Sequence, residues 1–458
     1  MIDTLAPYPA YKDSGVPWLG EVPEHWEVLP GRACYREKKV PNTGLRETTV
    51  LSLSYGQIVV KPEDKLHGLV PESFETYQIV DPGDIIIRPT DLQNDWNSLR
   101  FGSSRHRGII TSAYMCFQTQ PTVTREYGHL LLHAYDLKKI FYGLGSGLRQ
   151  NLDWRDFRYL PCCSPPLPEQ AAIVRFLDHA DHRIARYIRA KQRLIALLTE
   201  QKQAIIHHAV TRGLDPTTPL KPSGVAWLGD VPAHWERRAV SQLFEIGRGK
   251  VTSHQDIADN PGTYPVYSSQ TENDGVMGRI DSFMFEGDYL TWTTDGAHAG
   301  TVFRRSGRFN CTNVCGTLRP RGQTDLDFMR MAIASETKRQ VRLDINPKLM
   351  NNMMARIRVS VPPYPEQVQI AECVKQVVEP SDLAIERFRS EVALLREYRT
   401  RLIVEIVTGK LDVRAAAALL PDEADDPTPP DDLAADIDDP SDDTDSDTIT
   451  EEAADAAN

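Results

Sequence analysis

The chain contains one unusual segment twice, and this duplication constrains the fold more than any other feature of the sequence. SGVPWLGEVPEHW begins at Ser14, and SGVAWLGDVPAHW begins at Ser223, an offset of 209 residues (223 − 14). Because tryptophan is rare, chance is a poor explanation for two copies that hold four of the seven tryptophans. We interpret these four as packing anchors: Trp18, Trp26, Trp227 and Trp235. The duplication predicts one structural arrangement that is used twice.

A second pair of matching segments follows the first pair. PPLPEQ begins at Pro165 and PPYPEQ begins at Pro362, an offset of 197 residues (362 − 165). Proline is tolerated in the first turn of a helix, and a glutamate there suits the positive end of the helix dipole. Gly213 and Gly409 offer matching C-terminal stops. The chain therefore reads as tryptophan segment, variable block and long helix, twice over.

Both predicted helices carry an apolar stripe with alternating spacings of four and three, the heptad pattern of a coiled coil. The first helix, 165–214, would be roughly 70 Å long. In the second, 362–414, we expect a kink at Pro380 and a fresh start capped by Ser381. Two such stripes in one chain most simply pack as an antiparallel pair. The predicted seam consists of Ile173, Leu177, Ile184, Leu194, Leu198, Ile370, Val374, Val377, Phe388, Leu395 and Leu402.

The variable blocks are predicted to be mixed α/β domains. Gln78–Pro89 and Phe283–Thr294 each place Gly-Asp before an apolar run, which is typical of a turn that leads into a strand. We therefore expect an α+β chain in which two long helices separate two α/β domains, followed by a disordered tail. The predicted segments are 1–164 and 215–361 for the domains, 165–214 and 362–414 for the helices, and 415–458 for the tail.

The formal net charge of −12 disguises a nearly neutral body. Residues 421–458 hold 16 acidic and no basic side chains, and without them 52 basic residues face 48 acidic ones (64 − 16). The tail has too little apolar content to offset the entropy of ordering it, so we expect it to be disordered. An alternative is that it mimics phosphates and competes for basic surface on the body.

The sequence offers no catalytic, cofactor-binding or metal-binding candidate. GRGK at Gly247 lacks the earlier glycine and the following Ser/Thr of a phosphate-binding loop. Val361 precedes Pro-Pro-Tyr where an amino-methyltransferase needs a polar residue. The seven cysteines form no CxxC pair and are most simply buried thiols. No run of 18 apolar residues and no signal-like segment occurs, so we expect a cytoplasmic location without a membrane partner.

Taken together, these segments resemble the specificity subunit of type I restriction–modification systems. The resemblance covers about residues 13–414. It rests on the doubled tryptophan segment, the stretch GSGLRQNL from Gly145, the doubled PPxPEQ helix start, and the helix ends VTRG and VTGKLD. The second copy departs from the pattern at DINPKLMNN, from Asp344 to Asn352, where the glycine-rich stretch is missing.

The resemblance implies two target-recognition domains, each reading one half of a bipartite, asymmetric site in double-stranded DNA. The helices, conserved in that family, would set the spacing and bind methyltransferase subunits, two in number. A restriction/translocase subunit would complete the assembly. The chain itself would be non-catalytic and free of cofactors. S-adenosylmethionine, ATP and Mg²⁺ would belong to its partners, whose complex methylates adenine and cleaves DNA.

Arginine, glutamine and asparagine are the side chains suited to phosphates and base edges, and they gather in one loop region of each block. We predict DNA contacts from Arg88, Gln93, Asn94, Arg105, Arg107, Arg304, Arg305, Arg308 and Asn313. Two other interpretations stay open: a coiled-coil scaffold that holds two protein-binding domains, and an enzyme with its active site in one variable block.

Overall fold

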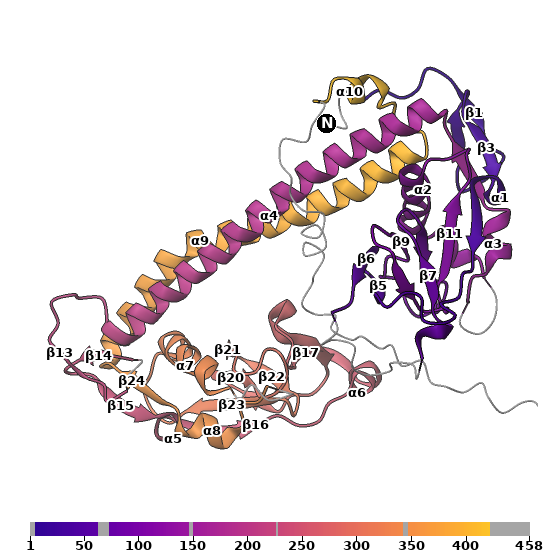
Figure 1. Cartoon of the computed structure of the whole chain (residues 1–458). Coiled ribbons are helices and arrows are strands. Elements are labelled where there is room, and N and C mark those ends of the chain that lie inside the picture. The colour runs from indigo at the N-terminus through magenta and orange to yellow at the C-terminus, as the bar shows by residue number, and fades with distance from the viewer. Residues whose placement is uncertain (1–4, 63–72, 146–149, 226–227, 342–346, 422–458) are drawn as a thin grey trace, which may run out of the picture. The chain divides into compact units, whose positions relative to one another are not determined.

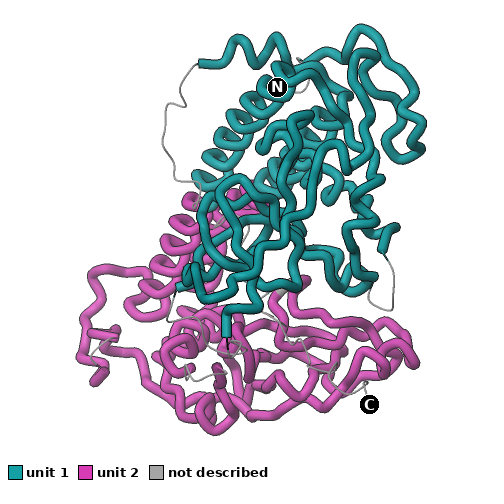
Figure 2. The backbone as a smooth tube through the Cα atoms, turned by 45° about the vertical axis from the view of Figure 1, so that its right-hand side comes forward, with its two compact units in different colours: residues 1–192, 390–458 teal, residues 193–389 magenta. Residues whose placement is uncertain are grey.

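The computed structural model describes residues 5–62, 73–145, 150–225, 228–341 and 347–421. Several features of the sequence lie outside this part: Trp227, residues 146–149 of GSGLRQNL, residues 344–346 of DINPKLMNN, and the acidic residues 422–458. The chain divides into two compact units, residues 1–192 with 390–458, and residues 193–389 (Figure 2). We call them unit 1 and unit 2. Each long helix contributes one part to each unit, so unit 2 is one continuous segment and unit 1 consists of the two segments on either side of it.

Unit 1 is built on a four-stranded antiparallel sheet in the order β4-β11-β8-β9. Figure 1 labels two of its strands, β11 and β9. These strands are β4 (Tyr35–Lys38), β11 (Met115–Thr119), β8 (Ile85–Ile87) and β9 (Phe101–Ser103). All of β8 is buried, because it is paired on both sides, and it is the apolar run predicted after Gly83. Helix α2 (Arg125–Leu137) begins at Thr124, whose hydroxyl accepts the amide of Tyr127, and its buried face joins the same core.

The smaller elements of unit 1 surround this sheet. They are β1 (Tyr11–Asp13), β2 (Glu21–Pro23), β3 (Glu27–Pro30), α1 (Gly31–Cys34), β5 (Leu51–Ser54), β6 (Gln57–Val60), η3 (Phe74–Thr76), β7 (Gln78–Val80), β10 (Gly108–Ile110), η4 (Ile140–Gly143), α3 (Trp154–Arg158), β12 (Pro161–Ser164) and α10 (Arg414–Ala418).

Unit 2 repeats the order of the main sheet as β16-β23-β20-β21. These strands are β16 (Phe244–Arg248), β23 (Cys315–Pro320), β20 (Tyr289–Thr293) and β21 (Val302–Arg305). Gly316 is required on β23, since a Cβ there would lie 2.1 Å from the ring of the buried Trp292. Helix α7 (Leu326–Gln340) takes the place that α2 has in unit 1, and it is capped by Asp325.

Unit 2 also has a second sheet, in the order β18-β17-β22-β19. Its strands are β17 (Pro261–Tyr267), β18 (Val276–Ile280), β19 (Phe285–Glu286) and β22 (Arg308–Cys311). The remaining elements are β13 (Leu220–Pro222), β14 (Asp230–Pro232), β15 (Glu236–Ala239), α5 (Val240–Leu243), α6 (His254–Asp259), η5 (Glu272–Gly275), α8 (Asn351–Arg356) and β24 (Arg358–Val361).

The two long helices are α4 (Leu167–Arg212) and α9 (Tyr364–Val407). Within unit 1, Asp181 pairs with Arg399 at 2.8 Å, and Lys191 pairs with Glu391. Within unit 2, Lys202 pairs with Asp382. Because the partner number falls as the number on α4 rises, the two helices run antiparallel in both units, as the paired stripes predicted.

The predicted seam is wrong at two of its eleven residues. Leu194 and Val377, both assigned to it, are 45% and 49% exposed. The buried positions continue instead at Ile188 and Val378, one residue later than the heptad pattern places them. A heptad assumes 3.5 residues per turn, whereas a straight helix has 3.6, so the contact stripe drifts by about 20° per heptad. The other predicted seam residues are buried or partly buried: Ile173, Leu177, Ile184, Leu198, Ile370, Val374, Phe388, Leu395 and Leu402.

Two further expectations for the C-terminal region need correction. Helix α9 continues through Pro380 as one helix, so Ser381 does not cap a second start. Residues 415–418 belong to α10, with Ala417 buried, so the ordered body extends past the predicted start of the tail at 415. The acidic residues 422–458 lie outside the described part of the chain.

The first tryptophan segment binds the start of α4. Trp26 is fully buried, and its indole Nε1 donates to Oε1 of Glu169 at 3.0 Å. The Nε2 atom of His25 donates to the other carboxylate oxygen of Glu169 at 2.7 Å. The next residue, Gln170, accepts the amide of Thr124 at 2.8 Å and so fixes the start of α2. We call His25, Trp26 and Glu169 the first clamp.

The second segment makes the same contacts at the start of α9. Trp235 donates to Glu366 at 3.0 Å, and His234 donates to it at 2.8 Å. Gln367 accepts the amide of Asp325, the cap of α7, at 2.9 Å. We call His234, Trp235 and Glu366 the second clamp. The duplicated segment is thus structural: it joins each α/β block to the N-terminus of the helix that follows.

Each clamp also receives the C-terminus of the other long helix. Gly409, beyond α9, has a φ of +77°, and a Cβ there would lie 2.4 Å from Pro23 and 3.0 Å from Trp26. Gly213, beyond α4, has a φ of +75°, and its Cβ would meet the ring of Trp235 at 3.4 Å. Both helices therefore end on a glycine because the backbone there is left-handed, a conformation that other residues rarely adopt.

Candidate nucleic-acid interface

The first group of predicted DNA-contacting residues lies between β8 and β9. Gln93 and Asn94 are exposed, and the side-chain amide of Asn94 donates to Asp91 at 2.8 Å. Arg88 is only 30% exposed, and its guanidinium lies 3.6 Å from the carboxylate of Asp95. The two amides are therefore presented to solvent, while the arginine lies at the base of the loop.

Arg105 and Arg107 lie apart from these residues, on the turn between β9 and β10, and both are exposed. Arg107 pairs with Asp81, and its Nε lies 3.5 Å from Glu47. The structure thus divides the predicted residues of unit 1 into a loop group and a turn group.

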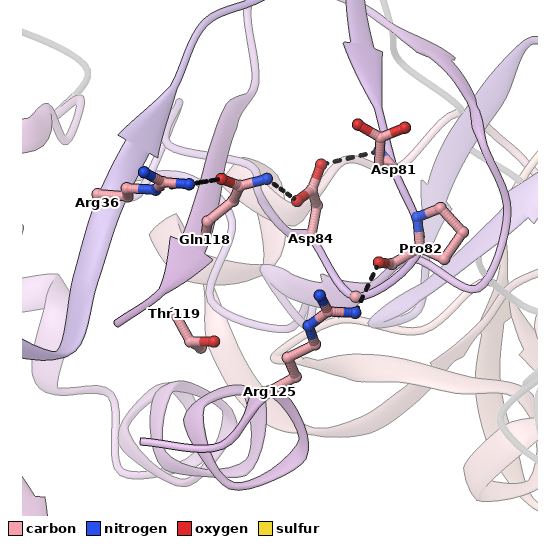
Figure 3. A pocket seen from close by; sticks show the side chains of 8 residues that line it. Arg36, Asp81, Pro82, Asp84, Gln118, Thr119 and Arg125 are labelled. Atoms are coloured by element: carbon pink, nitrogen blue, oxygen red, sulfur yellow. Dashed lines mark hydrogen bonds between the residues drawn. The ribbon is translucent and has the colours of Figure 1, made fainter. Parts of the chain in front are cut away.

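A polar pocket of about 200 Å³ opens near the turn group, and no sequence pattern predicted it (Figure 3). Two arginines reach it from different elements, Arg36 from β4 and Arg125 from the first turn of α2. Arg36 donates to Gln118 at 2.7 Å, and Gln118 in turn donates to the buried carboxylate of Asp84 at 2.9 Å. These side chains are far apart in sequence, so only the sheet order brings them together.

Opposite charges are balanced at one side of this pocket. Lys38 pairs with Asp81 at 2.8 Å and also with Asp84, and the ammonium group holds the pKa of Asp81 below its ordinary value. With Arg36, Arg107 and Arg125 nearby, four cationic groups face three carboxylates, those of Asp81, Asp84 and Glu47. The pocket and its rim are therefore an electropositive part of unit 1.

In unit 2, three of the four predicted residues are exposed. Arg304, on β21, is 43% exposed and pairs with Asp327 of α7. Arg308, on β22, is 48% exposed, pairs with Glu286 at 2.9 Å and lies over the ring of Phe283. Asn313 is exposed on the turn that leads into β23.

Arg305 differs from these three because it is buried. Its side chain is 2% exposed and pairs with Asp274 at 2.6 Å. The guanidinium carbon lies 3.7 Å from the centroid of the Tyr267 ring and 4.4 Å from that of Phe303. Arg305 therefore holds the turn at η5, and we do not retain it among the residues proposed to contact DNA.

A second buried arginine was missed by the sequence reasoning. Arg100 has no exposed surface and lies just before β9, inside the loop that carries Gln93 and Asn94. Its backbone amide donates to the carboxylate of Asp136 on α2 at 2.8 Å. Burial raises the pKa of Asp136 to about 6. The only signal in the sequence is that Arg100 directly precedes the apolar start of a strand.

Within ranges 5–62, 73–145, 150–225, 228–341 and 347–421, no three His, Cys, Asp or Glu side chains gather as they would around a metal ion. In the same ranges, no helix has the length and apolar character needed to cross a membrane.

Comparison with known proteins places the chain in one family. The sequence model of the type I restriction modification DNA specificity domain matches residues 232–391. A putative type I specificity subunit of Mycoplasma pneumoniae, S.MpnORF289P N-terminus, is 41% identical over 134 residues, which are 29% of this chain and 72% of that protein. Another from the same organism, S.MpnORF201P, is 35% identical over 165 residues, 36% of this chain and 69% of that protein.

Other relatives are matched over a smaller share of their length. The chain spans about half of the type I restriction enzyme MpnII specificity subunit of Mycoplasma pneumoniae, 50% of its length at 36% identity. Among solved structures, one reported for the complex assembly and conformational transition of the type I R-M system contains a similar fold. Its TM-score is 0.57 at 14% identity, over 85% of this chain and 99% of that one. The chain belongs to the family of type I restriction–modification specificity subunits.

Proposed function

We propose that this chain is the DNA-reading subunit of a type I restriction–modification complex. Unit 1 reads one half of a bipartite, asymmetric site in double-stranded DNA, and unit 2 reads the other half. The chain itself is non-catalytic. It directs partner subunits to the site, where the complete complex methylates adenine and cleaves DNA.

One observation carries this proposal: the same frame occurs twice around different surface loops. The clamps and the main sheet order are repeated, whereas the loop between β8 and β9 in unit 1 (residues 88–100) and the loop at the same place in unit 2, between β20 and β21 (residues 294–301), differ in length and sequence. A repeated frame with unlike loops is what two different half-sites require. Amides and arginines there have the chemistry to read base edges and to hold phosphates. The proposed contacts are Arg88, Gln93, Asn94, Arg105, Arg107, Arg304, Arg308 and Asn313.

The long helices are the proposed docking surface for two methyltransferase subunits. On the unit 2 half of α4, Leu194 and Leu197 are 45% and 52% exposed, and on the unit 1 half of α9, Leu394 is 63% exposed. Apolar side chains on a helix surface favour burial against a partner. A restriction/translocase subunit then joins the complex, and S-adenosylmethionine, ATP and Mg²⁺ are bound by these partners.

The experiment is a genome-wide methylation map of cells that express the methyltransferase partner, with and without this gene. We expect one bipartite motif to lose its methylation when the gene is deleted. An unchanged map would overturn the proposal. Replacing residues 32–145 with the same block of another family member should then change only one half of the motif, and a change in both halves would show that the units do not read independently.

The two rival interpretations give different results. Phosphate contacts release counterions, so the affinity of a DNA-binding protein for DNA falls steeply as the salt concentration rises. A protein-binding scaffold would not show such salt-dependent binding to DNA. An enzyme would cleave or methylate DNA as the isolated chain, without partner subunits.

A further inference from the structure

The loop between β8 and β9 is folded around one buried side chain, the guanidinium of Arg100. This group donates to the backbone carbonyls of Thr90 and Asp95, each at 2.7 Å, and to those of Arg88 and Asp91, each at 3.3 Å. It also donates to the hydroxyl of Tyr142 at 3.1 Å. The planar, five-donor guanidinium can satisfy so many acceptors at once, which a lysine ammonium cannot.

Further contacts fix the same loop from outside. Tyr142 donates to the carbonyl of Asp95 at 2.9 Å, and the carboxylate of Asp95 lies 3.8 Å from Arg100. Asn151 accepts the amide of Asp91 at 3.1 Å. A buried charge without partners would be strongly unfavourable, so the loop must keep this shape as long as Arg100 stays inside it. Residues 88–99 therefore form a rigid loop.

The outer surface of this rigid loop carries an exposed indole among exposed amides. Trp96 is 54% exposed, although one side of its ring packs on Tyr142 with the centroids 4.6 Å apart. Its Nε1 donates to the carbonyl of Gln93 at 3.2 Å, which sets the direction of the ring. Gln93, Asn94 and Asn97 are exposed beside it. A large apolar ring that is held in place and left open to solvent is typical of a residue that binds a partner.

Unit 2 also has a buried arginine at the edge strand of its main sheet, but at the opposite end of that strand. Arg305 is the last residue of β21, whereas Arg100 immediately precedes β9, and both strands lie at the edge of their four-stranded sheets. Arg305 donates to the carbonyl of Asp274 at 2.8 Å and lies on Tyr267, whereas Arg100 lies on Tyr142. The loop built around Arg100 is therefore particular to unit 1.

We propose that the loop 88–99 is the sequence-reading loop of unit 1, in which Trp96 contacts the DNA and Arg100 is the positioning residue. This inference rests on the proposed function and adds to it. Gln93 and Asn94 supply hydrogen bonds to base edges, and Trp96 supplies apolar contact with a thymine methyl group or the adjoining sugar. Because the loop is shaped before DNA arrives, binding does not carry the entropic cost of ordering it.

The test uses the full chain in complex with its methyltransferase subunits. The probes are a duplex that carries the mapped bipartite motif and two duplexes in which one half-site is scrambled; the exchange of residues 32–145 identifies the half read by unit 1. We expect Trp96→Ala to weaken binding to the intact duplex at least about tenfold. Trp96→Phe should recover most of this loss. Neither variant should change the affinity for the duplex whose unit 1 half is scrambled.

Arg100→Lys tests the positioning role through specificity. The prediction is that methylation spreads to sites with altered bases in the unit 1 half, while the other half stays fixed. Loss of stability alone would lower methylation at all sites and would not change the motif. Because Arg100→Lys alters a buried side chain, Gln93→Ala provides a second test on an exposed one, and it should relax the same half-site.

The outcomes separate this inference from the proposed function. If the wild-type complex does not distinguish the intact duplex from the scrambled ones, the proposed function fails. If it does, and Trp96→Ala and Gln93→Ala both bind and methylate as the wild type does, the reading loop lies elsewhere and this inference is overturned.

Discussion

The carboxylates of Glu169 and Glu366 make the same two bonds in different surroundings. The side chain of Glu169 is 5% exposed and that of Glu366 is 29% exposed. If the carboxylate is removed, water can therefore replace more of its hydrogen bonds at the second clamp than at the first. We expect Glu169→Ala to lower the free energy of unfolding by about 1–3 kcal/mol, because the indole N–H of Trp26 would be buried without a partner. Glu366→Ala is the matched control and should cost less. Denaturant unfolding monitors both, and equal losses would contradict the argument from burial.

Asp136 gives the fold a pH dependence of defined sign. Its pKa is raised to about 6 by burial, above the value near 4 that it has in the unfolded chain. Between these values the folded chain holds a proton that the unfolded chain has released, so this residue's contribution to stability falls as the pH rises from 4 to 6. Asp136→Asn should therefore raise the stability by roughly 1–3 kcal/mol at pH 7 and change it little at pH 4. Thermal unfolding across this range would show whether the difference between variant and wild type grows with pH.

At the scale of elements, prediction succeeded where the signal is local. The helices α4 and α9 begin at Leu167 and Tyr364, and in each a proline and a glutamate follow directly and mark the start. Gly213 and Gly409 follow the helix ends. The apolar run at Ile85 is a strand, as its pattern predicted. These signals depend on residues that are neighbours in the chain, and they locate an element without saying what packs against it.

The remaining features depend on partners that are distant in sequence. Arg304 and Arg305 are adjacent, yet only the second is buried, because Tyr267 and Asp274 come from another part of unit 2 to cover it. Arg100 is buried for the same kind of reason, by a loop that folds back over it. Periodicity within one strand does not contain this information. For that reason the sequence located the polar loops but could not separate surface arginines from structural ones.

The corrected helix register leads to a prediction on neighbouring turns of α4. Ile188 is 2% exposed, whereas Leu194, which the heptad pattern placed in the seam, is 45% exposed. Ile188→Ala should lower the free energy of unfolding by about 2–5 kcal/mol, since it leaves a cavity in the core of unit 1. Leu194→Ala should change it by less than about 0.5 kcal/mol. Denaturant unfolding of the isolated chain measures both changes. A large loss of stability with Leu194→Ala would show that Leu194 lies in the helix contact after all, as the heptad pattern predicted.

The exposed residues of α4 should matter when partners are present. Leu194→Lys combined with Leu197→Lys is expected to leave the isolated chain folded, because both side chains already face solvent. If the helix surface binds a methyltransferase subunit, the double variant should fail to elute with that subunit in size-exclusion chromatography. Leu45→Lys, at a residue 51% exposed away from the helices, is the matched control. Co-elution of the double variant at wild-type yield would place the docking surface elsewhere.

For the whole molecule, the clamps show why the two ends of the ordered chain belong to one unit. The ammonium group of Lys410 donates to the carbonyl of Leu19 at 3.2 Å and also to that of Glu21. The backbone amide of Asp412 donates to the carbonyl of Ala6 at 2.9 Å. Val413 is fully buried in the core of unit 1. The C-terminal segment therefore completes unit 1, although the whole of unit 2 separates it in sequence from the first part of that unit.

Truncation tests this arrangement directly. A chain that ends after Val407 keeps α9 but loses Gly409, Lys410 and Val413, so the first clamp loses one of its two helix ends. We expect unit 1 to lose on the order of 3–5 kcal/mol of stability and to be cut early in limited proteolysis, because its core is opened to water. Unit 2 lacks these contacts and should resist as before. A chain that ends after Pro421 keeps all of them and should match the full chain, although its net charge changes sign when the 16 acidic residues are removed. If both truncations were equally stable, the segment beyond α9 would be an appendage, and unit 1 would be complete without it.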